Sequence, residues 1–270
     1  MKKYLFIVAL GLACSIFLPP AYMPAVLADH KEPTSGKTPL VKAQVLKELP
    51  HNIKHFTQGL FFHQGKLYES AGRYGHSSIA IKDPQSGRSL LEKPLEPQFF
   101  GEGATLAGDS VYLLTWRENL GFVLDQKTLT EKGRFLYQGE GWGLTFDGER
   151  LIRSNGSDTL YFHALDGKPI GTLKVHEAGR PVTGLNELEW IPAQRLILAN
   201  IWGIPEIAAI GIDDGRILFR LDLTNLVPEE FKDSELYVLN GIALAPDGNS
   251  LWVTGKCWPV MYVLDWPAAP

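Results

Sequence analysis

The chain has 270 residues, of which 45% are hydrophobic and 21% are charged, and its formal net charge is −4. This composition is typical of a globular protein with enough apolar material for a core, and it excludes a disordered or fibrous chain. The sequence has no block of basic residues, so it does not favour a nucleic-acid partner.

Residues 1–28 have the features of a secretory signal peptide. Lys2 and Lys3 precede an apolar stretch over residues 4–18, and small residues suited to cleavage end at Ala28. The apolar stretch ends at two prolines and is shorter than the roughly 18–20 residues of a membrane-spanning helix. We therefore expect a secreted or periplasmic protein with no membrane association after cleavage, in which residues 29–39 form a linker.

Two alternatives to cleavage remain, which are an uncleaved anchor and a lipoprotein attached through Cys14. Cleavage would remove two lysines and Cys14, leaving a net charge of about −6 and Cys257 as the remaining cysteine. A mature chain with one cysteine has neither an internal disulfide nor a thiolate zinc site.

The rest of the chain, residues 40–270, contains an internal repeat. Each copy has a polar or aromatic residue beside glycine, then an apolar strand, a tight turn and a second strand. The five copies read "TQGLFFHQGKLYESAG", "GEGATLAGDSVYLLTW", "GWGLTFDGERLIRSNG", "LNELEWIPAQRLILANIW" and "LNGIALAPDGNSLWVTGK". Alternating stretches with hairpin turns such as Asp-Gly follow each copy.

The period of the repeat predicts a five-bladed β-propeller. The residues at matching positions are Gln58, Glu102, Trp142, Asn186 and Asn240, and the intervals between them are 44, 40, 44 and 54 residues. Periods of about 40–45 residues with four strands each are typical of propeller blades. The long last interval contains "TNLVPEEFKDSEL", which predicts a short helical insertion.

The fifth copy ends one strand short, at "VMYVLDW". Residues 40–49, "LVKAQVLKEL", alternate in hydrophobicity and precede the first copy. We therefore expect this N-terminal strand to supply the missing outer strand of the last blade and to close the ring.

In a propeller the first strand of every blade lines the central channel, so the matching residues converge at one mouth. The ends of the second strands reach the same mouth, which adds Trp116, Asn155, Trp202 and Lys256. A few polar groups among aromatic side chains are typical of a small-ligand pocket.

With these residues identified, the chain resembles the plant and bacterial glutaminyl-peptide cyclotransferases (glutaminyl cyclases). The matching strings are "HFTQGLFF", "LYESAGRYGHSS", "FFGEGATL", "GWGLTFDG", "LNELEW", "ANIW", "LNGIA" and "VTGKCWP". The resemblance implies a five-bladed propeller and an acyltransferase that converts N-terminal glutamine of peptides or proteins to pyroglutamate, releasing ammonia.

The resemblance also implies the residues of the site. These are Phe56, Gln58, Phe100, Glu102, Trp116, Trp142, Asn186, Trp202 and Lys256. The stretch "GIPEIAAI" after Trp202 departs from the more polar connection of the family, which leaves the peptide preference open. Asn240 and Trp258 are expected to be structural.

The chemistry suggests a role for each group. Cyclisation needs a folded-back glutamine, which stacked aromatic walls can enforce, and a group that moves a proton from the amine to the leaving nitrogen. We expect Glu102 to be this general acid/base, with Lys256 and Asn186 stabilising negative charge and Gln58 orienting the substrate.

Neither a metal nor a cofactor is expected. No P-loop, nucleophile elbow or dinucleotide fingerprint is present, and the histidines show no ligand spacing. The histidines are His30, His51, His55, His63, His76, His163 and His176. Glu187 and Glu189 alternate with leucines and are expected to be solvated.

The expected partners are peptides with N-terminal glutamine, and the expected state is a monomer.

Two other functions fit the repeat. A calcium-dependent propeller lactonase or esterase would use Gln58, Glu102, Asn186 and Asn240 as oxygen ligands, although a hard cation usually binds more than one carboxylate. A non-enzymatic propeller scaffold is the other alternative, because the fold alone does not decide function.

Overall fold

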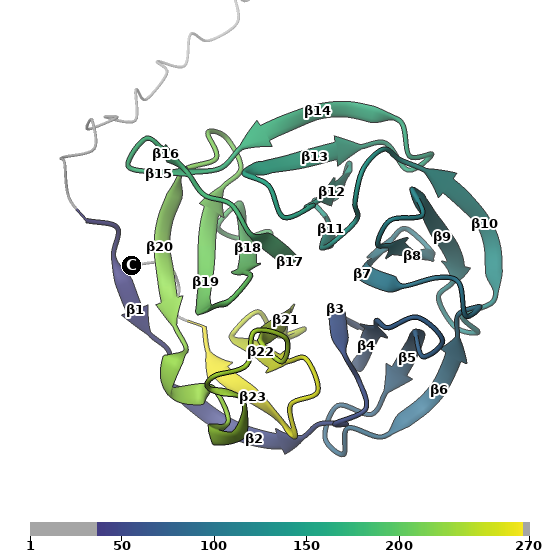
Figure 1. Ribbon diagram of the computed structural model, residues 1–270, viewed down its shortest axis with the longest axis horizontal. Coiled ribbons are helices and arrows are strands. Elements are labelled where there is room, and N and C mark those ends of the chain that lie inside the picture. The colour runs from purple at the N-terminus through teal and green to yellow at the C-terminus, as the bar shows by residue number, and fades with distance from the viewer. Residues whose placement is uncertain (1–36, 267–270) are drawn as a thin grey trace, which may run out of the picture. The chain divides into compact units, whose positions relative to one another are not determined.

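Four-stranded antiparallel sheets follow one another along the chain and form the five blades of a propeller, with their inner strands around a common axis (Figure 1). The computed structural model describes residues 37–266. The predicted signal peptide and residues 29–36 of the predicted linker lie outside the described residues. The five-bladed all-β fold predicted from the repeat is confirmed.

The strands of each blade are given in order from the inner strand to the outer strand. Blade 1 consists of β3 (Thr57–His63), β4 (Lys66–Ala71), β5 (Ser78–Lys82) and β6 (Ser89–Pro94). Blade 2 consists of β7 (Gly101–Ala107), β8 (Ser110–Thr115), β9 (Leu120–Asp125) and β10 (Glu131–Leu136). Blade 3 consists of β11 (Leu144–Phe146), β12 (Leu151–Arg153), β13 (Thr159–His163) and β14 (Pro169–Lys174).

The last two blades complete the ring. Blade 4 consists of β17 (Leu185–Ile191), β18 (Leu196–Ile201), β19 (Ile204–Gly211) and β20 (Ile217–Asp222). Blade 5 consists of β21 (Leu239–Leu244), β22 (Ser250–Gly255), β23 (Val260–Asp265) and β2 (Val45–Pro50). A small hairpin of β15 (His176–Glu177) and β16 (Arg180–Pro181) connects blade 3 to blade 4.

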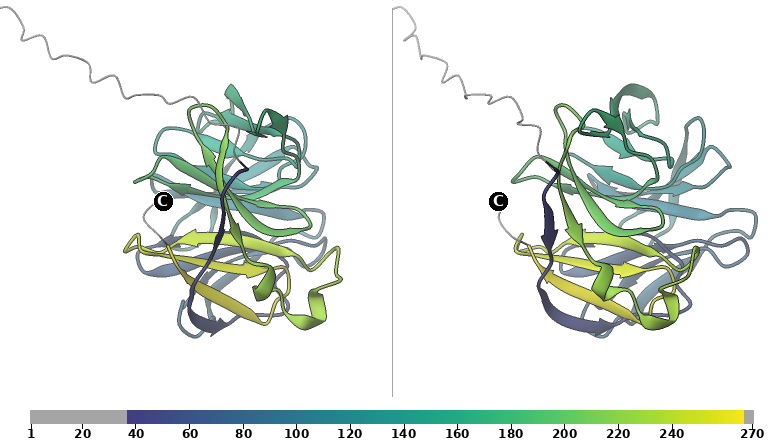
Figure 2. Two further views of the ribbon diagram at one scale, coloured as in Figure 1. Left: turned by 90° about the vertical axis from the view of Figure 1, so that its left-hand side faces the viewer. Right: turned by 60° about the vertical axis from the view of Figure 1, so that its left-hand side comes forward.

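The N-terminal segment closes the ring, as expected, but as two strands rather than one. β1 (Leu40–Lys42) runs parallel to β20 at the outer edge of blade 4, and β2 runs antiparallel to β23 in blade 5. The segment therefore lies along the outside of both blades (Figure 2). A period-2 pattern predicts a strand but does not indicate which edge it pairs with, so the division was not visible in the sequence.

The repeat residues occupy equivalent places in the inner strands. Gln58, Glu102, Asn186 and Asn240 are each the second residue of their strand, whereas Trp142 lies just before β11. The pairing register of each of these four strands shifts at this residue. Such β-bulges bend a strand and redirect a side chain, which turns all four side chains toward one mouth.

A steric requirement explains the glycine that follows Glu102 and the equivalent glycine that follows Gln58. A Cβ atom at Gly103 would lie 2.5 Å from the main-chain nitrogen of Leu144 in blade 3, and one at Gly59 would lie 2.4 Å from Ala104 N in blade 2. Neighbouring inner strands thus approach too closely for any side chain. The repeated glycine allows the polar residue beside it to converge with its counterparts.

Apolar side chains from adjacent blades form the core. Between blades 4 and 5, for example, Phe219 packs in one cluster with Trp258 and Tyr262. Fully burying one large apolar side chain stabilises the folded state by roughly 1.5–3 kcal/mol. As predicted, Trp258 is a structural residue, since it is fully buried and its indole N–H donates to Tyr237 O at 2.8 Å.

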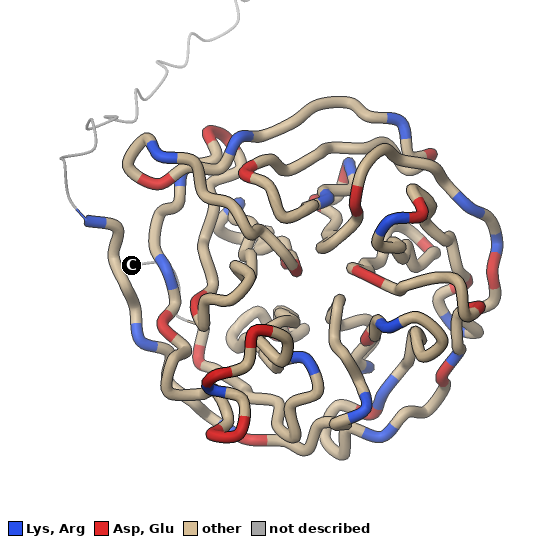
Figure 3. The backbone as a smooth tube through the Cα atoms, in the orientation of Figure 1, with Lys and Arg blue, Asp and Glu red and all other residues tan. Residues whose placement is uncertain are grey.

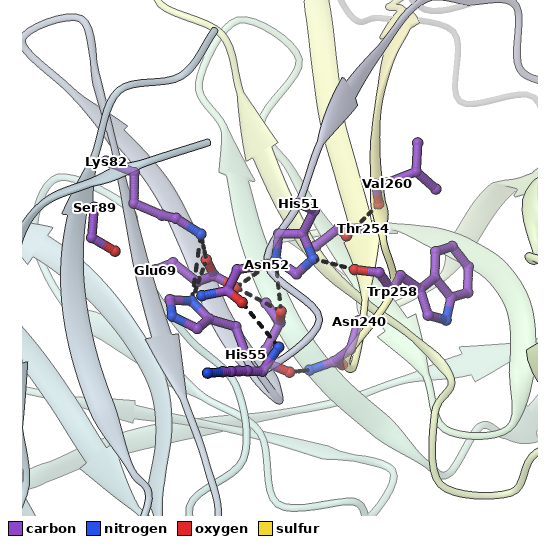
Figure 4. A network of polar contacts seen from close by, with 12 residues as sticks. His51, Asn52, His55, Glu69, Lys82, Ser89, Asn240, Thr254, Trp258 and Val260 are labelled. Atoms are coloured by element: carbon purple, nitrogen blue, oxygen red, sulfur yellow. Dashed lines mark hydrogen bonds and ion pairs between the residues drawn. The ribbon is translucent and has the colours of Figure 1, made fainter. Parts of the chain in front are cut away.

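A buried polar network joins blade 1 to blade 5 (Figure 4). The Glu69 carboxylate is bonded to His51 Nε2 at 2.8 Å and His55 Nδ1 at 3.0 Å, and it forms an ion pair with Lys82. His51 Nδ1 lies 2.7 Å from the main-chain oxygen of Trp258. In the part of the chain that is described, no three His, Cys, Asp or Glu side chains are arranged to hold a metal ion.

Glu187 is fully buried, so the expectation that it is solvated is wrong. Its two carboxylate oxygens accept hydrogen bonds from Leu60 N at 3.2 Å and Ile242 N at 2.8 Å. Glu189 is half-buried and accepts from Leu244 N at 2.8 Å. The alternating pattern misled because β17 is an inner strand with neighbouring blades on both sides.

The predicted helical insertion between blades 4 and 5 consists of two short 3-10 helices, η1 (Thr224–Leu226) and η2 (Glu229–Phe231). Within residues 37–266 no helix is long and apolar enough to cross a membrane. Charged residues of both signs are distributed around the outer strands (Figure 3).

Candidate active site

One mouth of the propeller contains a cavity of about 440 Å³. All nine residues predicted for the site line it, and they come from all five blades. The nine are Phe56, Gln58, Phe100, Glu102, Trp116, Trp142, Asn186, Trp202 and Lys256. Arg73 and Leu236 complete the lining.

The polar groups lie at the floor of the cavity. Glu102 is 4% exposed and Lys256 is 1% exposed, and Gln58 and Asn186 are also buried. A chain of hydrogen bonds orients the carboxylate, because Asn240 Nδ2 donates to Gln58 Oε1 at 3.2 Å and Gln58 Nε2 donates to Glu102 Oε1 at 3.0 Å. Asn240 is therefore a supporting residue behind the floor.

The environment shifts the pKa values of both charged groups at the floor. Burial raises the pKa of Glu102 well above its ordinary value; the Lys256 charge opposes this shift, and the Glu140 and Glu118 charges add to it. Burial lowers the pKa of Lys256 to about 8, although the Glu102 charge acts in the opposite direction. Burial thus favours the neutral form of both groups relative to their ordinary behaviour in water.

Aromatic rings form the walls. The Phe100 and Trp116 ring centres are 5.4 Å apart on one side, and those of Trp142 and Trp202 are 5.8 Å apart on another. Lys256 Nζ lies 4.2 Å from the centre of the Trp202 ring, within the range of a cation–π contact. The walls thus combine a flat apolar surface with a buried positive charge.

Glu140, which the sequence analysis did not single out, fixes two of these walls. Its Oε2 atom accepts hydrogen bonds from the indole N–H groups of Trp116 and Trp142, each at 2.9 Å. Partial burial would raise the pKa of Glu140, but these two bonds and Arg117 hold it below its ordinary value. An ionised Glu140 therefore bridges blades 2 and 3 behind the aromatic walls.

Asn186 has an unused hydrogen-bonding atom. It is buried, and among the described residues its Oδ1 atom has no hydrogen-bond partner. A carboxamide carries both donor and acceptor groups, so it can bind either kind of ligand atom. Asn155, which was expected at the same mouth, does not line the cavity; its Oδ1 accepts from Ser157 Oγ at 2.6 Å.

Arg73, Leu236 and Glu140 were missed because none occupies a repeated position. Arg73 lies in the turn after β4, Leu236 in the insertion before β21, and Glu140 in the connection from β10 to β11. The one feature of the sequence that could have indicated Glu140 is its position two residues before Trp142. Arg73 lies within the matching string "LYESAGRYGHSS" but was not singled out there, and nothing in the sequence indicated Leu236.

Comparisons with known proteins identify the family of the chain. The family model described as glutamine cyclotransferase matches residues 20–265. The chain is 37% identical over 226 residues to the glutaminyl-peptide cyclotransferase of Arabidopsis thaliana, covering 81% of this chain and 69% of that protein. The crystal structure of Myxococcus xanthus glutaminyl cyclase superimposes with a TM-score of 0.77 at 35% identity, covering 85% of this chain and 99% of that one. The chain therefore belongs to the glutamine cyclotransferase family of enzymes.

Proposed function

We propose that this protein is a glutaminyl-peptide cyclotransferase that uses Glu102 as its general acid and base. The observation that carries the proposal is a buried carboxylate with a raised pKa at the floor of an aromatic cavity, beside a buried lysine. Its substrates would be peptides or proteins with N-terminal glutamine, whose first residue the cavity of about 440 Å³ would hold.

The aromatic walls favour the folded conformer of the substrate. In the reaction the α-amine nitrogen attacks the side-chain amide carbon of the same glutamine, so both reacting groups belong to one residue. Well-oriented intramolecular reactions reach effective molarities of about 10⁵–10⁸ M. Trp116, Trp142 and Trp202 would hold the glutamine in the bent shape that brings nitrogen and carbon together.

Glu102 would carry the proton between the two nitrogens. The amine loses a proton as the new carbon–nitrogen bond forms, and the leaving nitrogen gains one as the old bond breaks and ammonia departs. The pKa of a peptide α-amine is about 7.7–8.0. Raising the pKa of a carboxyl group above its ordinary value reduces its difference from the pKa of the amine and so lowers the free-energy cost of the proton transfer.

The remaining polar groups would stabilise charge. The amide oxygen becomes negative in the tetrahedral intermediate. The Lys256 ammonium and the Asn186 carboxamide both line the cavity and would stabilise that charge. Gln58 would fix the ionised form of Glu102 through their hydrogen bond. This assignment requires no covalent nucleophile.

The cavity fits the lactonase alternative less well. A calcium ion takes six to eight oxygen ligands and usually several carboxylates, whereas Glu102 is the one carboxylate that lines the described cavity. The carboxamide oxygen of Gln58 is already bonded to Asn240. These contacts support the metal-independent cyclotransferase over a hard-cation site.

The test is ammonia release from a short peptide amide with N-terminal glutamine, measured with excess chelator. We expect release to survive the chelator, and the Glu102→Gln variant to lower kcat by roughly 10²–10⁴-fold, the range of general acid–base catalysis, with little change in KM. The matched control is Glu131→Gln, which neutralises a surface carboxylate paired with Arg134.

Each outcome has a distinct meaning. Full activity in Glu102→Gln contradicts the role of Glu102, and loss of activity with the chelator contradicts a metal-independent mechanism. Absence of release by the wild-type protein from every glutaminyl peptide contradicts the function itself and favours the lactonase or scaffold alternatives.

We also propose that the protein is exported. The support is the basic pair at Lys2 and Lys3, followed by an apolar stretch and a small-residue cleavage site at Ala28. N-terminal sequencing of the protein recovered outside the cytoplasm should begin at Asp29. Recovery of the chain with residues 1–28 attached, or with lipid on Cys14, contradicts this cleavage.

A further inference from the structure

Arg73 presents an unpaired guanidinium at the edge of the cavity. The residue is half-buried, and its Cζ atom lies 4.7 Å from the centre of the Phe56 ring and 5.5 Å from that of Tyr237. Within residues 37–266 its side chain forms no ion pair and no hydrogen bond. An arginine head carries five N–H donors, so this one can bind a group that enters the mouth.

The backbone holds Arg73 in an unusual conformation. Its φ angle is 101°, in the region that favours glycine and that other residues rarely adopt. The turn is fixed by three hydrogen bonds, from Gly72 N to Phe56 O, from His76 N to Arg73 O and from Ser77 Oγ to Arg73 O. Strain of this kind in a cavity lining indicates a functional side chain, because glycine would adopt the same turn without strain.

The depth of Arg73 indicates which part of a substrate it meets. The reacting groups are at the floor, where Glu102 and Lys256 are almost completely buried. Leu236, which lines the cavity beside Tyr237, is 47% exposed and marks the rim. The half-buried Arg73 lies between these two levels, where the second residue of a peptide would pass once its first residue reaches the floor.

Two acidic residues near the mouth, Glu118 and Glu140, have other partners, and within residues 37–266 the exposed Asp233 and Glu235 form no ion pair with Arg73. Glu118 accepts a hydrogen bond from Tyr74, and Glu140 is bonded to two indoles and to Arg117. The guanidinium of Arg73 is thus a positive charge in an aromatic setting without a counter-charge from the described chain. A carboxylate matches its planar donor geometry and can bind it through two parallel hydrogen bonds.

We propose that Arg73 binds a carboxylate one residue beyond the N-terminal glutamine, so that the enzyme prefers peptides with an acidic second residue. This inference rests on the proposed function and names its substrate class. The same carboxylate can be the side chain of a second-position Glu or Asp, or the C-terminus of a glutaminyl dipeptide. Arg73 is in either case a specificity-determining residue at the rim.

The experiment compares kcat/KM for three tripeptide amides, Gln-Glu-Ala, Gln-Gln-Ala and Gln-Lys-Ala. Glu and Gln at the second position have nearly the same shape, so their ratio isolates the charge. For the wild-type protein we expect kcat/KM to be about tenfold higher for Glu than for Gln, as a charge-assisted hydrogen bond implies, and lowest for Lys. The dipeptide Gln-Ala as free acid and as amide tests the second source of the carboxylate.

Three variants test the residue itself. Arg73→Gly removes the side chain and suits the φ angle, and Arg73→Met keeps the apolar stem. Arg73→Lys keeps the positive charge but lacks the planar set of N–H donors of the guanidinium. We expect the Glu-to-Gln ratio to fall to about one in Arg73→Gly and Arg73→Met, and to an intermediate value in Arg73→Lys. The ratio is internal to each variant, so a general loss of activity does not affect it.

The failure of this inference is distinguishable from that of the function. A wild-type protein that shows no preference among the three tripeptides and none between Gln-Ala acid and its amide overturns the role of Arg73 and leaves the cyclotransferase standing. A Glu-to-Gln ratio that persists in both Arg73→Gly and Arg73→Met does the same. A preference for the dipeptide acid without a preference for second-position Glu assigns Arg73 to the chain terminus. Absence of ammonia from every peptide overturns the proposed function.

Discussion

Gln58 and Glu102 are joined by a hydrogen bond of 3.0 Å, although they lie on the inner strands of different blades. The oxygen of Gln58 is bonded to Asn240 in a third blade, so its NH₂ group faces the carboxylate. The position and protonation of Glu102 therefore depend on how blades 1, 2 and 5 pack together. The packing of the propeller core thus also determines the geometry of the candidate active site.

The first prediction concerns the pH dependence of turnover. Glu102 must be ionised to accept a proton and Lys256 must be charged to stabilise the oxyanion. The pKa of Glu102 is raised well above its ordinary value and that of Lys256 is lowered to about 8. We expect kcat to rise with pH well above 4.5 and to fall as the pH passes about 8.

One variant distinguishes the titration of Lys256 from the titration of the substrate amine in this pH profile. Arginine stays protonated to pH values above about 12, so Lys256→Arg should keep its residual activity at pH values where the wild-type activity falls. The amine of the substrate titrates identically with both proteins. A descending limb at the same pH in the two proteins contradicts the assignment to Lys256.

The second prediction concerns Glu140 as a positioning residue. Its removal in Glu140→Ala frees the indoles of Trp116 and Trp142, and a hydrogen bond to a charged group is worth about 1.5–3 kcal/mol. We expect KM to rise by about tenfold or more, with a smaller change in kcat. The ascending limb of the pH profile should move to lower pH, because the Glu140 charge contributes to the raised pKa of Glu102.

The matched control is Arg117→Met. This substitution removes the bond of Arg117 to the other oxygen of Glu140, at 3.0 Å, and leaves the two indole bonds intact. The methionine stem retains an apolar contact over the Trp116 ring, on which Arg117 stacks at 3.6 Å. A rise in KM as large as that of Glu140→Ala would contradict the role of the indole bonds.

The third prediction concerns the buried network around Glu69. Burial alone would raise the pKa of this carboxyl, but the charges of His51 and Lys82 and the hydrogen bonds of both imidazoles hold it well below its ordinary value. Removing one partner of a buried ion pair costs about 3–5 kcal/mol. Glu69→Gln should lower the free energy of unfolding in urea by about this amount, because Lys82 remains buried.

The sign of the pH effect follows from the lowered pKa. The folded state resists protonation of Glu69 while the unfolded chain binds a proton near its ordinary pKa of about 4.3. The stabilisation is thus complete above that value and is lost as the pH falls toward the folded-state pKa. The double variant Glu69→Leu with Lys82→Met should recover part of the loss, and no recovery would contradict the ion-pair account.

The fourth prediction concerns Glu187, whose two oxygens each accept a main-chain N–H. Glutamine supplies one oxygen, so Glu187→Gln leaves one buried donor unpaired at a cost of about 1–3 kcal/mol. Glu189→Gln should cost less, because Glu189 is half-buried and the glutamine oxygen can still accept from Leu244 N. Equal losses in thermal stability would contradict this explanation.

The repeat predicted the fold and most of the site for a physical reason. Inner strands of a propeller are equivalent, so a bulge that aims Gln58 into the mouth recurs at Glu102, Asn186 and Asn240. The order of the matching motifs then indicated the aromatic walls. Spacing alone would not have separated Asn240, which supports the site, from Asn186, which lines it.

The features that escaped prediction lie outside the repeat. Arg73, Glu140 and Leu236 occupy connecting loops, whose paths depend on the blades they join. The histidines at 51 and 55 have no spacing that predicts their shared contact with Glu69, because the loop before β3 and the strand β4 bring them together. Contacts between blades join residues that are far apart in the sequence, so they are recognised only once the closed ring is known.

The pairing of β2 with β23 has a consequence for how the molecule assembles. Residues 45–50 leave the ribosome before blades 1 to 4 are synthesised, whereas their partner strand, Val260–Asp265, follows those blades. Until then β2 has no partner strand, and an unpaired strand edge is prone to aggregation. Closure of the ring therefore waits until the inner strands of all five blades and β23 have been synthesised.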